Sequence, residues 1–180
     1  FAGLNVVYER DLDLTLLQGT TILRTSATPD PYPSPIGADT AVQLTEFGTF
    51  WQNNQSAVSR AFAMLLSGKS DNNFSSAGIA WVLNGSNYCT ARNANGGHYS
   101  VTQVFKFAGS NASHDILVIA HELGHNFGAF HTHCSNASTG AGPTASNTID
   151  TCFTGEQGCF NGTPVCPVPG VVNGVSNVRG

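Results

Sequence analysis

The sequence predicts an α/β fold whose sheet is twisted, mixed and mostly parallel, with one antiparallel edge strand. Two patterns support this prediction. Short apolar runs bounded by Gly, Ser and Asn alternate with longer stretches in which apolar residues recur every three or four positions, as in buried strands and in helices. From residue 129 onward the chain is rich in Gly, Ser, Thr and Pro and carries four of the five cysteines. This region is predicted to be a loop-rich, disulfide-bearing C-terminal subdomain.

The first part of the chain shows helical, strand-like and loop patterns in turn. Residues 1–8 carry apolar side chains at helical spacing and are expected to be the end of a helix. Alternating leucines over residues 12–16, followed by the apolar pair at 22–23, predict strands with one buried face. Residues 28–38 contain four prolines and are expected to form a loop.

A helix is predicted over residues 40–56, because apolar residues recur there at three- and four-residue intervals. Thr40 and Gln43 form a capping-box pattern at its start. We expect its apolar stripe, which includes three aromatic residues, to pack in the core rather than to bind a ligand. The stripe consists of Val42, Leu44, Phe47, Phe50 and Trp51.

Three more strands and a second long helix are expected after this helix. Residues 61–66 and 77–83 are short apolar runs and predict buried strands. Residues 98–107 are predicted to include the edge strand. A helix over residues 113–127 follows, with Ser113 as its N-terminal cap.

The most informative stretch is residues 121–131, which spell H-E-x-x-H-x-x-G-x-x-H. His121 and His125 are four apart, so on a helix both imidazoles lie on one face and converge on one ion. A glycine at position 128 can adopt a left-handed conformation, which would end the helix and bring His131 to the same ion. Three protein ligands leave one position open, as in catalytic zinc sites; iron and manganese are the alternative metals. A chance motif on an ordinary helix would not require the glycine or the third histidine.

Glu122 comes directly after the first histidine, so we expect its carboxylate beside the metal. There it would act as general base toward a water molecule whose pKa zinc lowers to about 7. The motif therefore predicts a catalytic zinc site that activates water.

This motif resembles that of the metzincin zinc metallopeptidases, and the chain is most similar to bacterial-type members of the reprolysin (adamalysin-like) family. Residues 8–12 and 30–32, and the cysteine-bearing segment after the third histidine, resemble the corresponding parts of that family. The resemblance implies a metzincin-like fold with an active-site helix and a substrate cleft. It also implies zinc ligation by His121, His125 and His131, with Glu122 as the general base.

By the same resemblance, residues 1–180 are expected to form a single catalytic domain, with 1–128 as the upper subdomain and 129–180 as part of the lower one. Metzincins carry a methionine in a turn downstream of the third histidine, but the only methionine here is Met64. We therefore expect a fragment that lacks the Met-turn, to which a missing C-terminal segment or a pro-segment would be a partner. Thr132 is a second departure, because many adamalysin-like proteins have aspartate there.

The five cysteines are Cys89, Cys134, Cys152, Cys159 and Cys166. The last four lie in the loop-rich region, which predicts disulfides and an oxidising, extracellular compartment. The odd number leaves one thiol free or paired outside the chain. A structural zinc cluster is an alternative, although no C-x2-C pair is present. A regulatory zinc-binding thiol at Cys134 is another.

Composition argues against two classes of function. The net charge is −4 with no basic run, which argues against nucleic-acid binding. No apolar stretch approaches the length of a membrane span. The other histidines are expected at the surface or in loops; they are His98, His114 and His133. Some reprolysin-like proteins bind calcium, and the candidate calcium ligands here are Glu9, Asp11 and Asp30.

The sequence therefore predicts a secreted zinc-dependent endopeptidase that acts on polypeptides. An extended substrate would pair with the edge strand by β-augmentation. The alternative is a catalytically silent metzincin-like module that binds other proteins. The absent methionine turn and the odd cysteine favour that module, whereas Glu122 argues against it. An exopeptidase is a third possibility, which depends on whether the cleft is closed at one end.

Overall fold

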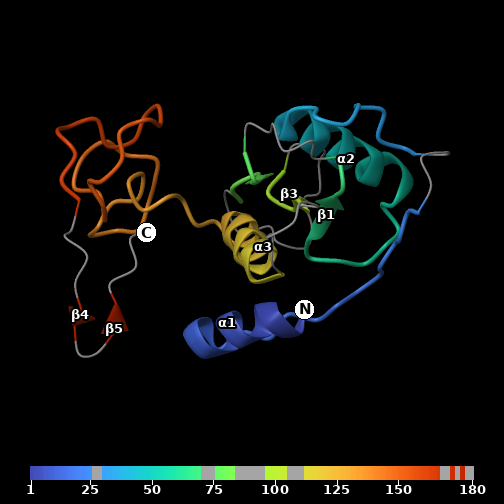
Figure 1. The fold of residues 1–180 in the computed structure, drawn as a ribbon, viewed down its shortest axis with the longest axis horizontal. Coiled ribbons are helices and arrows are strands. Elements are labelled where there is room, and N and C mark those ends of the chain that lie inside the picture. The colour runs from blue at the N-terminus through green and yellow to red at the C-terminus, as the bar shows by residue number, and fades with distance from the viewer. Residues whose placement is uncertain are drawn as a thin grey trace. The chain divides into compact units, whose positions relative to one another are not determined.

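The computed structural model describes residues 1–25, 30–69, 76–83, 96–104, 112–166, 171–172 and 175–176. These residues form an α/β structure with three helices, a three-stranded mixed sheet and a short two-stranded hairpin (Figure 1). The chain divides into two compact units, Phe1–Ala129 and Phe130–Gly180.

The sheet of the first unit consists of β1 (Ala63–Ser67), β2 (Gly78–Ala80) and β3 (Tyr99–Gln103). Its order is β1-β3-β2, with β3 parallel to β1 and antiparallel to β2. The predicted mixed sheet is therefore confirmed. The prediction that residues 98–107 include the edge strand is wrong for the described residues, up to 104, because β3 pairs on both sides. All five residues of β3 are buried, and within the described chain the antiparallel edge is β2.

Two helices, α2 (Thr40–Asn54) and α3 (Ala112–Asn126), both pack against β2 and β3. Figure 1 shows them on opposite sides of the sheet, which explains why the central strand is buried along its whole length. The predicted helix over residues 40–56 is thus confirmed with slightly shorter bounds.

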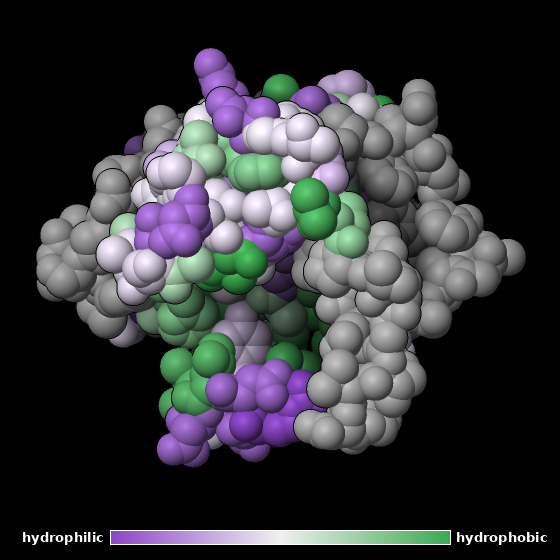
Figure 2. Space-filling view, turned by 90° about the vertical axis from the view of Figure 1, so that its left-hand side faces the viewer, coloured by the Kyte–Doolittle hydropathy of each residue, from purple (hydrophilic) through white to green (hydrophobic). Residues whose placement is uncertain are grey.

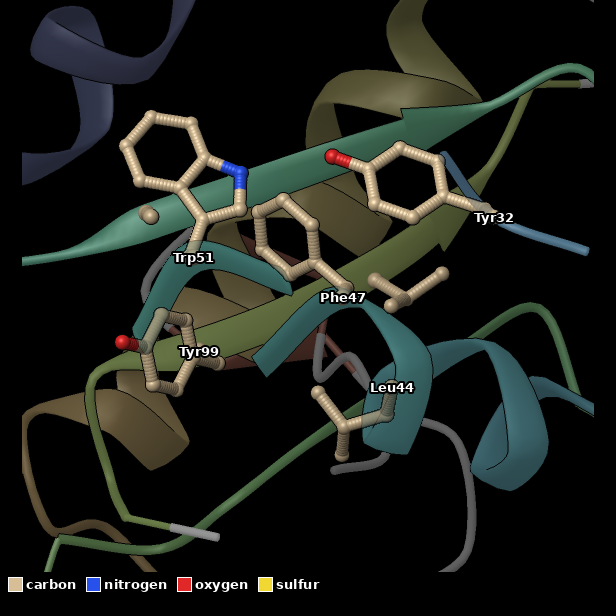
Figure 3. Packing of buried hydrophobic residues seen from close by; sticks show 7 residues of the cluster. Tyr32, Leu44, Phe47, Trp51 and Tyr99 are labelled. Carbon is tan, nitrogen blue, oxygen red and sulfur yellow. The ribbon is translucent and has the colours of Figure 1, made fainter. Parts of the chain in front are cut away.

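The hydrophobic core lies between α2 and the sheet (Figure 3). Phe47 is at its centre, with ring-centroid distances of 5.7–5.9 Å to Tyr32, Trp51 and Tyr99. These contacts confirm the core role of the aromatic stripe, whereas Val42 of the same pattern is 49% exposed. Tilted and edge-on ring pairs of this kind contribute about 0.5–1.5 kcal/mol beyond their buried area.

The N-terminal cap of α2 differs from the predicted one. The side chain of Asp39 accepts a hydrogen bond from the backbone N–H of Ala41 at 2.8 Å, so Asp39 is the cap. Thr40 is the first helical residue and is buried. Gln43 does not complete a capping box, because its side-chain amide donates to the carbonyl of Ala38.

The helix α1 (Ala2–Leu12) packs against α3. The Tyr8 hydroxyl donates a hydrogen bond to the carbonyl oxygen of Ala120 at 2.8 Å, and burial raises the pKa of Tyr8 to about 12. At Gly3 a Cβ would lie 2.7 Å from Ile116, so the two helices approach closely. The predicted N-terminal helix is confirmed and supports the middle of α3.

The strands predicted over residues 12–16 and 22–23 are absent, since residues 13–25 contain no strand. The alternating pattern fails because Leu12 still belongs to α1 and Asp13 ends the helix with a φ of 53°. The side-chain amide of Asn5 then pairs with both backbone groups of Leu16, at 2.8 and 3.1 Å. A side chain thus satisfies the backbone groups that a neighbouring strand would otherwise bind.

The second unit has little regular structure. Its described residues contain only the antiparallel pair β4 (Val171–Val172) and β5 (Val175–Ser176) as strands. Two disulfides, Cys134–Cys159 and Cys152–Cys166, hold its loops together. The predicted disulfides are confirmed. The alternatives of a zinc cluster and of a regulatory thiol at Cys134 are wrong because these four sulfurs are paired.

Only 10% of the residues are charged. In the view of Figure 2, pale residues of intermediate hydropathy cover much of the described surface, and strongly hydrophilic residues form small patches among them. None of the helices in the described residues combines the length and the hydrophobicity that a membrane crossing requires. Cys89, the fifth cysteine, lies outside the described residues.

Candidate active site

The helix α3 carries three of the predicted site residues, namely His121, Glu122 and His125. The predicted helix over residues 113–127 is confirmed within one residue at each end. Ser113 is not the N-cap that the sequence predicted, because α3 already includes Ala112 and Ser113 is its second residue. Leu123 on the same helix is 3% exposed and packs inward.

The imidazoles of His121 and His125 converge. Their Nε2 atoms are 3.2 Å apart, and the ring planes are at 86° to each other. Two nitrogens that each lie 2.0–2.1 Å from a tetrahedral ion would be about 3.3 Å apart. The spacing in α3 therefore fits two ligands of one zinc ion.

The tautomer of His125 follows from its second contact. Its Nδ1 lies 2.7 Å from the carbonyl oxygen of Ala129. Because a carbonyl only accepts, Nδ1 must carry the proton, and the lone pair of a neutral ring is then on Nε2. A backbone acceptor on the far nitrogen is the usual partner of a metal-binding histidine.

The C-terminal end of α3 is fixed by backbone geometry and by one buried amide. Gly128 has a φ of 95°, which confirms the predicted left-handed glycine, and its N–H donates to the carbonyl of His125 at 2.8 Å. Asn126 is fully buried, and its side-chain amide donates to the carbonyls of Trp81 and Tyr99 at 3.0 and 3.1 Å. These bonds attach the helix end to the strands beside it.

Glu122 is 5% exposed and lies against β2. A Cβ on Gly78 would be 2.6 Å from its Oε1, so only glycine leaves room for the carboxylate there. Burial raises the pKa of Glu122 to about 7, because the charged form loses hydration. A divalent cation nearby would favour the ionised form and lower this pKa.

An open pocket of about 400 Å³ lies in front of the carboxylate. It is lined by Leu117, His121 and Glu122 of α3 and by Ala77 and Gly78 at the start of β2. Two of the predicted site residues therefore face one pocket, beside the edge strand of the sheet.

His131 belongs to the second unit, where its ring has defined partners. Its Nδ1 is 2.7 Å from Oε2 of Glu156, and the same oxygen is 2.8 Å from Nε2 of His133. The rings of His131 and His133 stack, with centroids 5.3 Å apart. Although partial burial opposes ionisation, hydrogen bonds from the two histidines hold the pKa of Glu156 below its usual range.

The three remaining histidines lie at the surface or in turns, as the sequence predicted. His98 lies in the turn before β3, which fits the predicted loop position, but its side chain is buried, with Nδ1 3.1 Å from the carbonyl oxygen of Ala61. His114 is exposed at the start of α3, as predicted, whereas His133 is only 12% exposed in its side chain.

Calcium binding is not supported by the acidic residues that suggested it. Asp11 pairs with its neighbour Arg10, and Asp30 pairs with Lys69 at 2.9 Å. Glu9 accepts a hydrogen bond from Thr15. None of the three belongs to a group of possible metal ligands among the described residues.

Sequence reasoning missed three residues around the site. Gly78 lets the backbone of β2 approach the Glu122 side chain, and Asn126 binds two backbone carbonyls with a buried amide. No local sequence pattern reveals either contact. Glu156 has one sequence signal: it precedes Cys159 by three residues, as His131 precedes Cys134. The disulfide between these cysteines brings the two segments together.

Comparison with known proteins supplies the family. A reprolysin model of metallo-peptidase family M12 matches residues 1–170, a range that includes the whole H-E-x-x-H-x-x-G-x-x-H motif. No curated protein and no solved structure matches the chain. The family match covers far more than the motif and agrees with the convergent imidazoles of α3. The chain therefore belongs to metallo-peptidase family M12, as a reprolysin-like metzincin.

Proposed function

We propose that this chain is a secreted zinc-dependent endopeptidase, with His121, His125 and His131 as zinc ligands and Glu122 as the general base. The observation that carries the proposal is the convergence of two imidazole Nε2 atoms beside a buried carboxylate, in a chain of a metallopeptidase family. By this proposal residues 1–180 form a single metzincin-like catalytic domain with subdomains 1–128 and 129–180.

The donor atoms support zinc rather than another metal. Each candidate ligand is an imidazole, and nitrogen ligands in a tetrahedral set suit zinc. His125 and His131 each direct Nδ1 to an oxygen acceptor within their own unit, so Nε2 is the nitrogen that would bind an ion. They are six positions apart in the sequence, and Gly128 between them has a φ of 95°.

The chemistry divides between the metal and the protein. When bound, zinc would polarise the scissile carbonyl and lower the pKa of a water molecule to about 7. Glu122 would accept a proton from that water molecule as the water oxygen bonds to the carbonyl carbon. Glu122 then delivers the proton to the leaving amine nitrogen as the C–N bond breaks, which is the normal exchange of roles for a general base.

The edge strand supports an extended polypeptide as substrate. Because β3 is bonded on both sides, the strand that would receive a substrate is β2 rather than residues 98–107. Gly78 of β2 lines the pocket together with Glu122. Backbone pairing along β2 would place a peptide carbonyl near the carboxylate with little demand on side-chain identity.

The disulfides support secretion. The pairs Cys134–Cys159 and Cys152–Cys166 form and persist in oxidising compartments such as the extracellular space.

The test is Glu122→Gln, with zinc content and hydrolysis of a fluorescently labelled, denatured protein measured on the same sample. We expect full zinc occupancy and a loss of turnover of about 10²–10⁴-fold, the usual contribution of a general base. Glu9→Gln removes an exposed carboxylate on α1 and should leave both values unchanged. Near-normal turnover of Glu122→Gln would contradict the general-base assignment. A zinc-loaded parent without turnover would instead favour a binding module.

A further inference from the structure

We propose that Glu156 is a positioning residue for His131: its carboxylate fixes the ring so that Nε2 faces a zinc ion. This inference rests on the proposed function, because it takes His131 as the third zinc ligand. It adds a residue that lies 25 positions away in the sequence and outside the H-E-x-x-H-x-x-G-x-x-H motif.

The hydrogen-bond chemistry of the cluster defines the tautomer. Oε2 of Glu156 lies 2.7 Å from Nδ1 of His131 and 2.8 Å from Nε2 of His133. An ionised carboxylate only accepts, so both ring nitrogens must donate. A neutral His131 that donates from Nδ1 has its lone pair on Nε2. A metal-binding histidine commonly has this arrangement, with a carboxylate on the nitrogen away from the metal.

The ring plane of His131 is held as well as its tautomer. His133 stacks on it with an interplanar angle of 16°, and Phe153 contacts the ring of His133 at 4.9 Å. One oxygen of Glu156 thus holds two stacked rings. A rotation of His131 about its Cβ–Cγ bond would break its hydrogen bond and lose the stacking contact.

Glu156 is itself fixed by the covalent structure of the second unit. The disulfide Cys134–Cys159 links the segment of the histidines to the segment of the glutamate. Next to it, the N–H of Phe160 donates to the carbonyl of His133 at 2.9 Å. The carboxylate is therefore presented to His131 by a short, cross-linked pair of turns.

A metal ion held directly by this cluster is a competing explanation, because the donor atoms of His131, His133, Cys134 and Glu156 lie within 4.8 Å of one another. The sulfur of Cys134 is in a disulfide, however, which leaves three donors. Both histidines are already hydrogen-bonded to the same oxygen of the glutamate. If Glu156 instead positions His131, the hydrogen bonds of Glu156 to both histidines stay intact.

The experiment is a double-mutant cycle on zinc affinity, measured on the whole chain by competition with a chromophoric chelator. We expect Glu156→Ala to raise the zinc Kd about 10-fold, the lower end of the 10–100-fold range for such partners. The lower end applies because Glu156 and His131 are 41% and 37% exposed, so water competes for the hydrogen bond. Glu156→Gln keeps an acceptor oxygen and should recover part of the affinity.

The cycle separates positioning from other roles. In a His131→Ala background, Glu156→Ala should have no further effect, because its influence passes through His131. An undiminished effect there would overturn the proposal, as would equal losses in the Ala and Gln variants. His133→Asn should preserve one zinc per chain; a loss of bound metal in that variant would favour direct ligation and overturn positioning.

Failure of the proposed function gives a different result. If His131→Ala alone left the zinc Kd unchanged, His131 would not be a ligand, whatever Glu156 does. If His131→Ala weakened binding and Glu156→Ala did not, only the positioning role would fail. Side-chain ¹H–¹⁵N spectra of the zinc-free chain give a readout independent of binding: the protonated Nδ1 of His131 should be lost as the dominant tautomer in Glu156→Ala and kept in Glu9→Gln.

Discussion

At the scale of single residues, the site depends on close packing as much as on donor chemistry. Glu122 is the proposed base, but its position is set by a residue without a side chain. At Gly78 a Cβ would lie 2.6 Å from Oε1, 2.7 Å from Cγ and 2.9 Å from Cδ of Glu122. All of these are shorter than a normal van der Waals contact, so the carboxylate and β2 fit together only because position 78 is glycine.

We predict that Gly78→Ala lowers kcat while zinc affinity stays the same. The added methyl displaces the Glu122 carboxylate, and a misplacement of about 1 Å costs on the order of 10²-fold in rate. Turnover of a labelled protein and chelator competition give the two quantities. Gly19→Ala is the matched control, since a Cβ there meets nothing within 4 Å. A Gly78→Ala variant with unchanged kcat would show that Glu122 is free to adjust.

At the scale of elements, the loop before α2 is tied to the strand β1 that follows it. Lys69, just after β1, forms an ion pair with Asp30 at 2.9 Å and donates to the carbonyl of Ser34 at 2.8 Å. Asp30 also accepts from the N–H of Tyr32 at 3.0 Å, which positions a ring of the core. This cation thus helps to order residues 30–38, which contain no helix or strand.

We predict that the stability contributed by Asp30 depends on pH. Burial opposes its ionisation, but the hydrogen bonds from Lys69 and Tyr32 hold the pKa of Asp30 below its usual range. Because its pKa is lower in the folded chain, ionised Asp30 stabilises the fold at pH values above its unfolded-state pKa of about 3.9. This contribution is lost as the pH falls through the folded-state pKa. Asp30→Asn should therefore lower the free energy of unfolding at pH 7, and the difference from the parent should close below about pH 4.

Urea denaturation of the parent and of Asp30→Asn at pH 7 and at pH 3 measures the difference in their free energies of unfolding. In a Lys69→Gln background the effect of Asp30→Asn at pH 7 should be smaller, because one of its two partners is already gone. A gap between Asp30→Asn and the parent that is equally large at pH 3 and pH 7 would contradict the assignment.

What the sequence predicted well was local, and what it missed depends on distant residues. The convergence of His121 and His125 could be predicted from helical periodicity alone, and the left-handed conformation of Gly128 from the need to end the helix. The alternating leucines over residues 12–16 were misleading because the side chain of Asn5 took the place of a partner strand. The central position of β3 depends on pairing with two other strands, and the role proposed for Glu156 depends on which cysteines pair. Neither the strand pairing nor the disulfide pairing can be read from the sequence, so the spacing of Glu156 to Cys159 has meaning only once the cysteine pairs are known.

At the scale of the whole molecule, the two units obtain their stability in different ways. Phe1–Ala129 has an aromatic core between α2 and the sheet. The described part of Phe130–Gly180 has little regular structure, and its loops are closed by two disulfides spanning 25 and 14 residues. Such cross-links typically contribute about 2–4 kcal/mol each by restricting the unfolded chain. Bound metal would add to both sources, because it binds only the folded chain.

We predict that removal of zinc lowers the Tm. At a free zinc concentration of about 100 times the Kd, binding stabilises the folded chain by about 2.7 kcal/mol, which corresponds to roughly 5–10 °C for a domain of this size. Differential scanning fluorimetry with and without a chelator measures the shift, and added zinc should reverse it. His121→Ala should show a much smaller shift. The same shift in that variant would mean that the stabilising ion binds elsewhere.

The closeness of Cys134 to two imidazoles and a carboxylate matters for how the protein is produced. In a host whose cytoplasm keeps thiols reduced, the sulfur of Cys134 would become a fourth donor beside His131, His133 and Glu156, a set that zinc binds well. Such a preparation would pass a metal assay, yet its ion would occupy the wrong place. Expression through a secretory route, with thiol titration before any metal analysis, distinguishes correctly loaded material from this trapped form.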